Sequence, residues 1–218
     1  AEPNFDGSVF AEANALLQHR NPAAAFARYE SLLPRNQDRP DLQFNRALAL
    51  RRLGRRPESI AGFRRAWLLA PEEGRVYSHL VELYDEEGDA ERARMFAGIE
   101  RVFRADAEKG LESLLELGTK GSAAVRLEAY DFLGFTAHHI GRPDIAEYAW
   151  DEYLKLKPDN AGILLNLFLL NEDRSPAKAL SALRRHLALV AGKAEPARVE
   201  ALLERARALE EKLRAARP

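Results

Sequence analysis

The sequence predicts an all-α fold, a solenoid of antiparallel helical hairpins that ends in a C-terminal capping helix. Three observations support this prediction. Apolar residues recur at helical spacing, turn signals recur at a fixed interval, and segments typical of β-strands are almost absent. Because the 218 residues are enough to bury a continuous core, we expect one domain over residues 1–218.

The repeat is marked by four turns, each followed by a small residue. The small residues are Ala25, Ser59, Ala93 and Ala146. The first three are 34 residues apart, and the fourth follows after 53, which is 34 plus an insertion of 19. A small residue lets a second helix approach the first closely, and the residue four positions later lies on the same face. The spacing therefore predicts helical hairpins.

Glycine and proline predict where the helices of these hairpins end. Gly54, Gly88 and Gly141 stand where the first helix must end, a position that favours the left-handed conformation. Pro71 and Pro158 occupy equivalent positions and should stop the second helix. The first repeat lacks a glycine in its turn.

The pattern resembles the tetratricopeptide repeat (TPR), a unit of 34 residues with two antiparallel helices. The best match is carried by Tyr130, Leu133, Gly134, Ala146, Trp150 and Pro158. The resemblance implies a right-handed solenoid whose first helices line a concave groove that holds a peptide. On this register the predicted segments are repeats at about 6–39, 40–73, 74–103, 121–160 and 161–191, an insertion helix at 104–120 and a capping helix at 195–217.

The insertion helix carries Leu111, Leu114 and Leu115 and is expected to end at Gly118. The C-terminal helix has a heptad step formed by Val199, Leu202, Ala206, Leu209, Leu213 and Ala216. These residues fit either a capping helix that covers the last hairpin or a coiled-coil homodimer. We favour the capping helix.

The inventory of chemical groups predicts no enzyme, no cofactor and no metal. The chain has no Cys, and it has no nucleotide-binding loop and no hydrolase or metalloprotease motif. His138 and His139 are adjacent and should point about 100° apart on a helix, which does not suit one metal ion. The formal net charge of -1 gives no general attraction to nucleic acid. No apolar run approaches the roughly 20 residues of a transmembrane segment.

One basic run has two interpretations. Arg51, Arg52, Arg55 and Arg56 form the densest cluster of charge. It could bind an acidic partner, or it could pair with the acidic turn at 85–89, which comes one repeat later. We favour pairing within the chain and leave the alternative open.

The predicted groove combines apolar residues near both ends with polar residues in its middle. Its residues are Phe10, Asn14, Leu17, Phe44, Asn45, Leu48, Arg51, Arg75, His79, Glu82, Asp131, Phe135, His138, Leu165 and Leu169. In some TPR proteins, basic and amide side chains of the groove hold the C-terminal carboxylate of a partner. The resemblance places Asn14, Asn45 and Arg75, with His79 in part, at such positions, although Phe10 replaces the first Lys.

We therefore expect a non-enzymatic adaptor that binds a partner protein or peptide in the groove. Arg outnumbers Lys by 26 to 7, which we interpret as bacterial coding bias, and a role in an envelope or secretion assembly follows by analogy. The alternative is a homo-oligomeric structural protein that assembles through the C-terminal helix or the apolar repeat near Leu165. The chain begins Ala-Glu-Pro without Met, so the cytoplasm and, if an export signal was removed, the periplasm both stay open.

Overall fold

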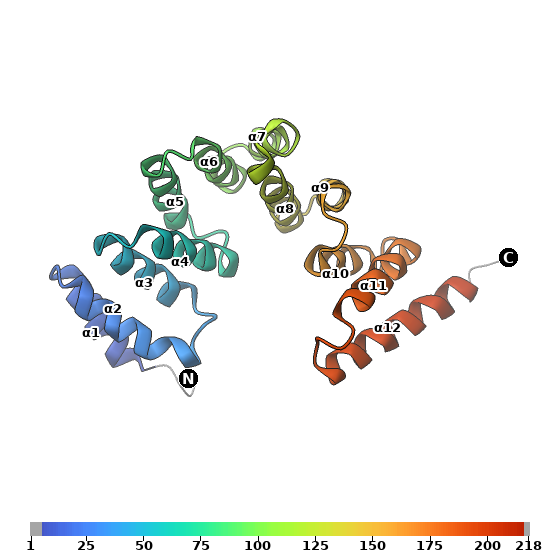
Figure 1. Cartoon of the computed structure of the whole chain (residues 1–218), viewed down its shortest axis with the longest axis horizontal. Helices are drawn as coiled ribbons and strands as arrows, with labels where there is room; N and C mark the ends of the chain where they lie inside the picture. The colour runs from blue at the N-terminus through green and yellow to red at the C-terminus, as the bar shows by residue number, and fades with distance from the viewer. Residues whose placement is uncertain (1–5, 216–218) are drawn as a thin grey trace. The chain divides into compact units, whose positions relative to one another are not determined.

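The computed structural model describes residues 6–215, and this part of the chain is built from α-helices without a β-strand (Figure 1). The all-α prediction is therefore confirmed. In order, the chain forms α1 (Gly7–Gln18), α2 (Pro22–Leu32), a short 3-10 helix η1 (Leu33–Arg35), α3 (Pro40–Arg52), α4 (Arg56–Leu69), α5 (Arg75–Glu86), α6 (Ala90–Arg104), α7 (Ala107–Lys120), α8 (Ala123–His139), α9 (Pro143–Leu156), α10 (Ala161–Asn171), α11 (Pro176–Val190) and α12 (Pro196–Ala215).

The chain divides into two compact units, called unit 1 (up to Gly110) and unit 2 (from Leu111). In unit 1, α1 packs on α2, α3 on α4 and α5 on α6 as three hairpins, and α2 packs on α3 and α4 on α5. In unit 2, α8 packs on α9, α10 on α11, and α12 on α11. The bounds of the predicted repeats stay predictions. The single domain over 1–218 and its right-handed path stay predictions.

The small residues of the repeat lie between the paired helices, as predicted. Ala25 and Ala146 are fully buried, and the Ser59 hydroxyl donates a hydrogen bond of 2.9 Å to the carbonyl oxygen of Ala47. A Cβ at Gly62 would lie only 2.9 Å from that of Ala47. The helices of a hairpin therefore approach so closely that only small side chains fit between them.

The turn prediction is confirmed at Gly54, Gly88 and Gly141, whose φ angles are 74°, 75° and 73°. The left-handed conformation at the end of the first helix puts a side chain in steric conflict, which glycine avoids. In the first hairpin Arg20 takes the same conformation, with φ 60°. The first turn therefore has the same geometry as the others, although its left-handed residue is Arg20 and not a glycine.

The end predicted for the insertion helix is wrong. The helix α7 continues to Lys120, and Gly118 lies inside it. A Cβ at Gly118 would come within 2.8 Å of the Tyr130 ring, so this glycine provides a close contact in place of a helix end. Of its leucines, Leu111, Leu114 and Leu117 are buried, whereas Leu115 is 36% exposed.

The C-terminal helix caps the last hairpin of unit 2. Leu202, Ala206 and Leu209 of the predicted heptad are buried, and α12 packs on α11. Arg205 lies 4.4 Å from the centre of the Phe168 ring and forms an ion pair with Glu172. This packing is the arrangement that the capping interpretation predicts. Ala216, the last heptad position, lies outside the described residues.

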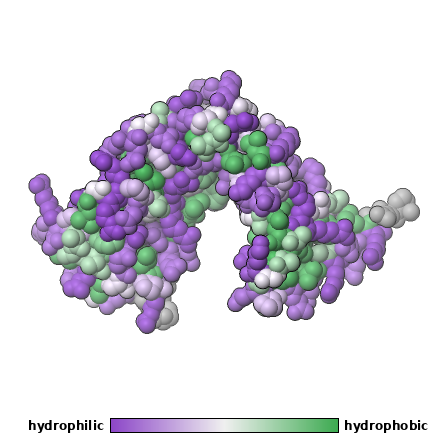
Figure 2. Space-filling model, viewed as in Figure 1, coloured by the Kyte–Doolittle hydropathy of each residue, from purple (hydrophilic) through white to green (hydrophobic). Residues whose placement is uncertain are grey.

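Figure 2 shows hydrophilic residues over most of the visible face of both units, with smaller apolar areas between them. Within residues 6–215, no helix combines the length and the apolar character needed to cross a membrane.

Candidate functional site

Part of the predicted groove forms one connected surface on the first helices of the unit 1 hairpins. The Asn14 side-chain oxygen accepts hydrogen bonds from the Tyr29 hydroxyl at 2.7 Å and from the Asn45 amide at 3.1 Å, which links α1 to α3. The His79 ring of α5 stacks on Phe63 at 4.8 Å and lies 5.6 Å from Phe44. These contacts hold α1, α3 and α5 together as a single face.

The apolar residues predicted at the N-terminal end of the groove belong largely to the core. Leu17 is 5% exposed and packs among the buried residues of the first hairpin, and Phe10 and Leu48 pack against the same cluster. The Phe10 ring meets Tyr29 edge-on at 6.0 Å. Leu17 is therefore not part of the surface that we consider below.

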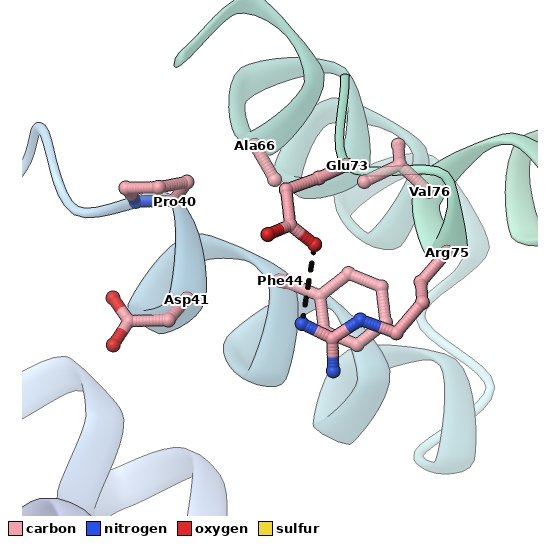
Figure 3. Close-up of a pocket in the computed structure, with 7 residues that line it drawn as sticks. All are labelled: Pro40, Asp41, Phe44, Ala66, Glu73, Arg75 and Val76. Atoms are coloured by element: carbon pink, nitrogen blue, oxygen red, sulfur yellow. Dashed lines mark hydrogen bonds and ion pairs between the residues drawn. The ribbon is translucent and has the colours of Figure 1, made fainter. Parts of the chain in front are cut away.

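The face contains a pocket between the N-terminal ends of α3 and α5, with an empty volume of about 350 Å³. Its lining residues are Pro40, Asp41, Phe44, Ala66, Glu73, Arg75 and Val76 (Figure 3). The Arg75 guanidinium lies 4.9 Å from the centre of the Phe44 ring and 3.4 Å from the Glu73 carboxylate. Apolar carbon atoms and three charged groups thus meet in one hollow.

The Arg51–Arg56 run pairs within unit 1. Arg51 contacts Glu82 at 2.8 Å and Glu86 at 3.2 Å, and Arg56 contacts Glu86 at 3.1 Å. The pairing lies one repeat away, as predicted, and Glu86 belongs to the predicted acidic turn. Glu82 is an additional partner one helical turn earlier, and Asp89 pairs with Arg92 of its own helix. Of the predicted groove cations, Arg51 is thus neutralised, whereas Arg75 is 68% exposed.

The environment of His79 favours its neutral form. Burial and the neighbouring Arg51 lower the pKa of this imidazole below its usual value, although Glu82 acts in the opposite direction. The His79 Nδ1 atom lies 2.7 Å from the Arg51 guanidinium, which can only donate, so the nitrogen is the acceptor. His79 therefore contributes an aromatic surface and no positive charge, which weakens its expected part in a carboxylate clamp.

The carboxylate clamp stays a prediction drawn from the resemblance. The Asn14 oxygen already accepts two hydrogen bonds from within the chain, and Arg75 leans over Phe44. The described contacts do not bring Asn14, Asn45 and Arg75 around one common point.

The remaining predicted groove residues lie in unit 2 and are described separately. The Phe135 and His139 rings are 4.2 Å apart, and the exposed His138 lies 6.1 Å from Trp150. Leu169 is 51% exposed, whereas Asp131 and Leu165 are half-buried. None of the five lines a described pocket of unit 2.

One pocket of unit 2 was missed by the sequence interpretation. It lies among α9, α10 and α11, and its lining includes Asp151, Asn171 and Arg185. Glu147 and Asp151 are one helical turn apart, and two carboxylates at this spacing repel each other. That spacing was the signal in the sequence that could have indicated the pocket. Among residues 6–215, no three His, Asp or Glu side chains are placed to hold a metal ion.

No model of a known protein family matches the sequence, and no curated protein is similar to it. The similar solved structures include the APC/C hetero-tetramer Cut9-Hcn1, with 16% identity, 94% of this chain and 43% of that chain covered, and a TM-score of 0.43. PilF of Pseudomonas aeruginosa has 17% identity, coverage of 96% and 86%, and a TM-score of 0.41. YrrB, described as a TPR protein with an unusual peptide-binding site, has 15% identity, coverage of 88% and 90%, and a TM-score of 0.41. At these values the likeness concerns the fold alone.

Proposed function

We propose that the chain is an adaptor that binds a partner protein through the pocket between α3 and α5 and performs no chemistry itself. The observation that carries this proposal is the composition of the pocket. Its walls are formed by the faces of Phe44, Ala66 and Val76, while Asp41, Glu73 and Arg75 surround them with charge. Hollows of this mixed character suit an apolar anchor residue whose backbone is oriented by polar contacts.

The geometry indicates the kind of segment that would bind. An aliphatic or aromatic side chain would fill the hollow against Phe44, and water would be displaced from apolar carbon. Arg75 is 68% exposed and has a long contact of 3.4 Å with Glu73, so its guanidinium can turn to donate hydrogen bonds to a carbonyl or carboxylate oxygen of the bound segment. Asn45 and Glu82 lie on the same set of helices and could contact the flanking backbone.

The setting expected from the sequence, a bacterial envelope or secretion assembly, is part of this proposal. The support for it is the arginine-rich composition and the analogy of fold, so identification of the partner is the way to test it.

Affinity capture from an extract of the source cells tests the proposal. The baits are the unaltered chain, Arg75→Glu in the pocket and Arg101→Glu as a control. Arg101 is an exposed arginine of α6 in the same unit and does not line the pocket. Circular dichroism establishes that all three baits are folded.

We expect a partner that is retained by the unaltered chain and by Arg101→Glu and is depleted at least tenfold by Arg75→Glu. A partner that all three baits retain equally would contradict the use of this pocket. Loss of the partner with both variants would show that the charge of unit 1, and not the pocket, controls binding.

A further inference from the structure

We propose that His79 is a pH-dependent switch in unit 1: protonation of its ring displaces the Arg51 side chain and transfers Glu82 from Arg51 to the imidazolium. The switch is a rearrangement of side chains on α3 and α5, and it does not depend on the function proposed above. Only its effect on partner binding rests on that function.

The contact between Arg51 and His79 determines which ring nitrogen takes up the proton. The Arg51 guanidinium lies 2.7 Å from the Nδ1 atom of His79. Because a guanidinium only donates hydrogen bonds, Nδ1 is the bare nitrogen of the neutral ring, and Nε2 carries the hydrogen atom. Protonation therefore adds a hydrogen atom to Nδ1 itself. Two positively charged donors then face each other, so Arg51 has to leave this position.

The imidazole ring is held in place by two aromatic neighbours. The half-buried ring stacks on Phe63 of α4, with the ring centres 4.8 Å apart and the planes 17° apart, and lies 5.6 Å from Phe44 of α3. An imidazolium can keep this packing, because the face of a phenyl ring attracts a cation. The Arg51 side chain is long and 22% exposed, so Arg51 moves and His79 stays.

Two carboxylates of α5 allow the exchange of partners. Glu82 lies 2.8 Å from Arg51, and Glu86 lies 3.2 Å from it. Burial and Arg51 lower the pKa of His79, whereas Glu82 raises it, and within residues 6–215 these two side chains are the charges that act on the ring. The neighbour from α4, Phe63, is uncharged. A hydrogen atom on Nδ1 would be donated to Glu82, and Arg51 would keep Glu86.

The buried histidine of unit 2 has the opposite arrangement. The Nδ1 atom of His186 lies 2.7 Å from the carbonyl oxygen of Ala161, which only accepts, so this nitrogen donates. A second proton would be added at Nε2 and would leave that hydrogen bond in place. The switch at His79 therefore follows from its contact with a guanidinium and not from the burial of a histidine.

The switch lies next to the α3–α5 pocket. Phe44, which contacts the His79 ring, is also a wall of that pocket. Arg51 links the C-terminal end of α3 to α5, and the pocket lies between the N-terminal ends of the same two helices. Because release of Arg51 removes a link that fixes α3 relative to α5, acidic pH should weaken the binding of a partner.

Nuclear magnetic resonance of the ¹⁵N-labelled full chain between about pH 8 and about pH 5 tests the switch. The ring nitrogen shifts of His79 show which nitrogen carries the hydrogen atom, and the side-chain Nε signal of Arg51 reports its contacts. The variants are Arg51→Met, Glu82→Gln and His79→Phe, which keeps an aromatic ring. The control is His19→Gln, at an exposed histidine of the same unit.

We expect Nδ1 of His79 to be the bare nitrogen at about pH 8, and the Arg51 signal to change with the same midpoint as the His79 ring. Arg51→Met should raise the pKa of His79 and Glu82→Gln should lower it, while His19→Gln leaves it unchanged. In His79→Phe the change at Arg51 should disappear.

Three results would overturn the proposal: a bare Nε2 in His79, an Arg51 signal that does not follow the His79 titration, or a change at Arg51 that persists in His79→Phe. The opposite pKa shifts in Arg51→Met and Glu82→Gln test the same contacts without relying on the folding of His79→Phe.

Affinity capture separates the switch from the proposed function. The unaltered bait should retain at least about threefold less partner at about pH 5.5 than at about pH 7.5, and His79→Phe should remove this dependence. Capture that does not change with pH would overturn the effect on the pocket. The absence of any partner sensitive to Arg75→Glu at both pH values would instead reject the proposed function, while the resonance data decide on the switch.

Discussion

The hairpin α3–α4 in unit 1 and the hairpin α8–α9 in unit 2 have the same framework but different surfaces. Each turn contains a left-handed glycine, Gly54 or Gly141, and each second helix has a buried small residue, Ser59 or Ala146. Near the C-terminal end of α3, the positive charge of Arg51 is neutralised, because Arg51 pairs with two glutamates of α5. On α9, Asp151 forms no ion pair within residues 6–215, although Lys178 and Lys155 lie near enough to oppose the rise in its pKa.

The residues that determine the hairpin differ from the residues that determine its surface. Turn glycines and small residues set the approach of two helices, and they recur because each hairpin has the same packing requirement. The charges on the outer face are free to vary. The dense run at Arg51–Arg56 is conspicuous in the sequence, but Arg51 and Arg56 pair with glutamates of α5 in the structure.

The largest expected effect concerns the framework. A Cβ at Gly134 would overlap the buried indole of Trp150, whereas a Cβ at Gly62 would lie 2.9 Å from the Ala47 methyl and 3.4 Å from the Ala47 Cα atom. Overpacking of this kind lowers the free energy of unfolding by about 1–3 kcal/mol, and the higher helix propensity of Ala raises it by about 1 kcal/mol. In urea unfolding, Gly134→Ala should therefore lower stability by about 1–2 kcal/mol and Gly62→Ala by less than about 1 kcal/mol. The reverse order would show that this packing analysis is wrong.

The turns should respond in opposite directions. Gly141→Ala places a side chain in a left-handed residue and should cost about 1 kcal/mol. Arg20→Gly removes such a side chain and should stabilise the first hairpin by about 0.5 kcal/mol, since the greater freedom of glycine in the unfolded chain offsets part of the gain. Thermal unfolding of both variants measures the two effects. A loss of stability in Arg20→Gly would contradict the shared turn geometry.

The ion pairs of unit 1 should contribute less. The Arg51 side chain is 22% exposed and the Glu82 side chain 57% exposed, so solvent screens their contact. A double-mutant cycle with Arg51→Met and Glu82→Gln should give a coupling energy of about 0.2–1 kcal/mol that decreases in 1 M salt. A coupling energy of zero at low salt would mean that the basic run Arg51–Arg56 is available to a partner.

The smallest effect is expected at Asp151, with the opposite sign. Because its pKa is raised in the folded chain, the ionised carboxylate destabilises the fold at neutral pH. Asp151→Asn should therefore raise Tm slightly, by no more than about 3 °C, at pH 7. The gain should disappear as the pH falls below the usual pKa of an aspartate, where the carboxyl is protonated in both states. Charges near Asp151 are those of Glu147, Glu152, Lys155 and Lys178, and the same comparison in Asp159→Asn controls for net charge.

The sequence predicted the hairpins well because their determinants are local. A turn glycine, a small residue and a stop at Pro71 or Pro158 act within one repeat, and the structure places them as expected. The helix end predicted at Gly118 was wrong, because the sequence does not distinguish a glycine that ends a helix from one that packs against a ring such as that of Tyr130.

The sites were predicted less well because they depend on contacts between helices. Phe44 and Arg75 were named in advance, but their meeting with Asp41 and Glu73 requires the angle between α3 and α5. Similarly, Lys178 of α11 forms its ion pair with Glu147 of α9, and the sequence does not indicate this choice of partner. Spacing along one helix gives no information on such choices.

The most direct test of the central claim, that the α3–α5 pocket receives a partner, is site-specific photo-crosslinking in the source cells. A photoreactive benzoylphenylalanine replaces Glu73 at the pocket or Arg101 on α6. We predict a crosslinked partner at position 73 that is absent at position 101 and is lost when Arg75→Glu is added. The same partner crosslinked at both positions, or one that is insensitive to Arg75→Glu, would contradict the account.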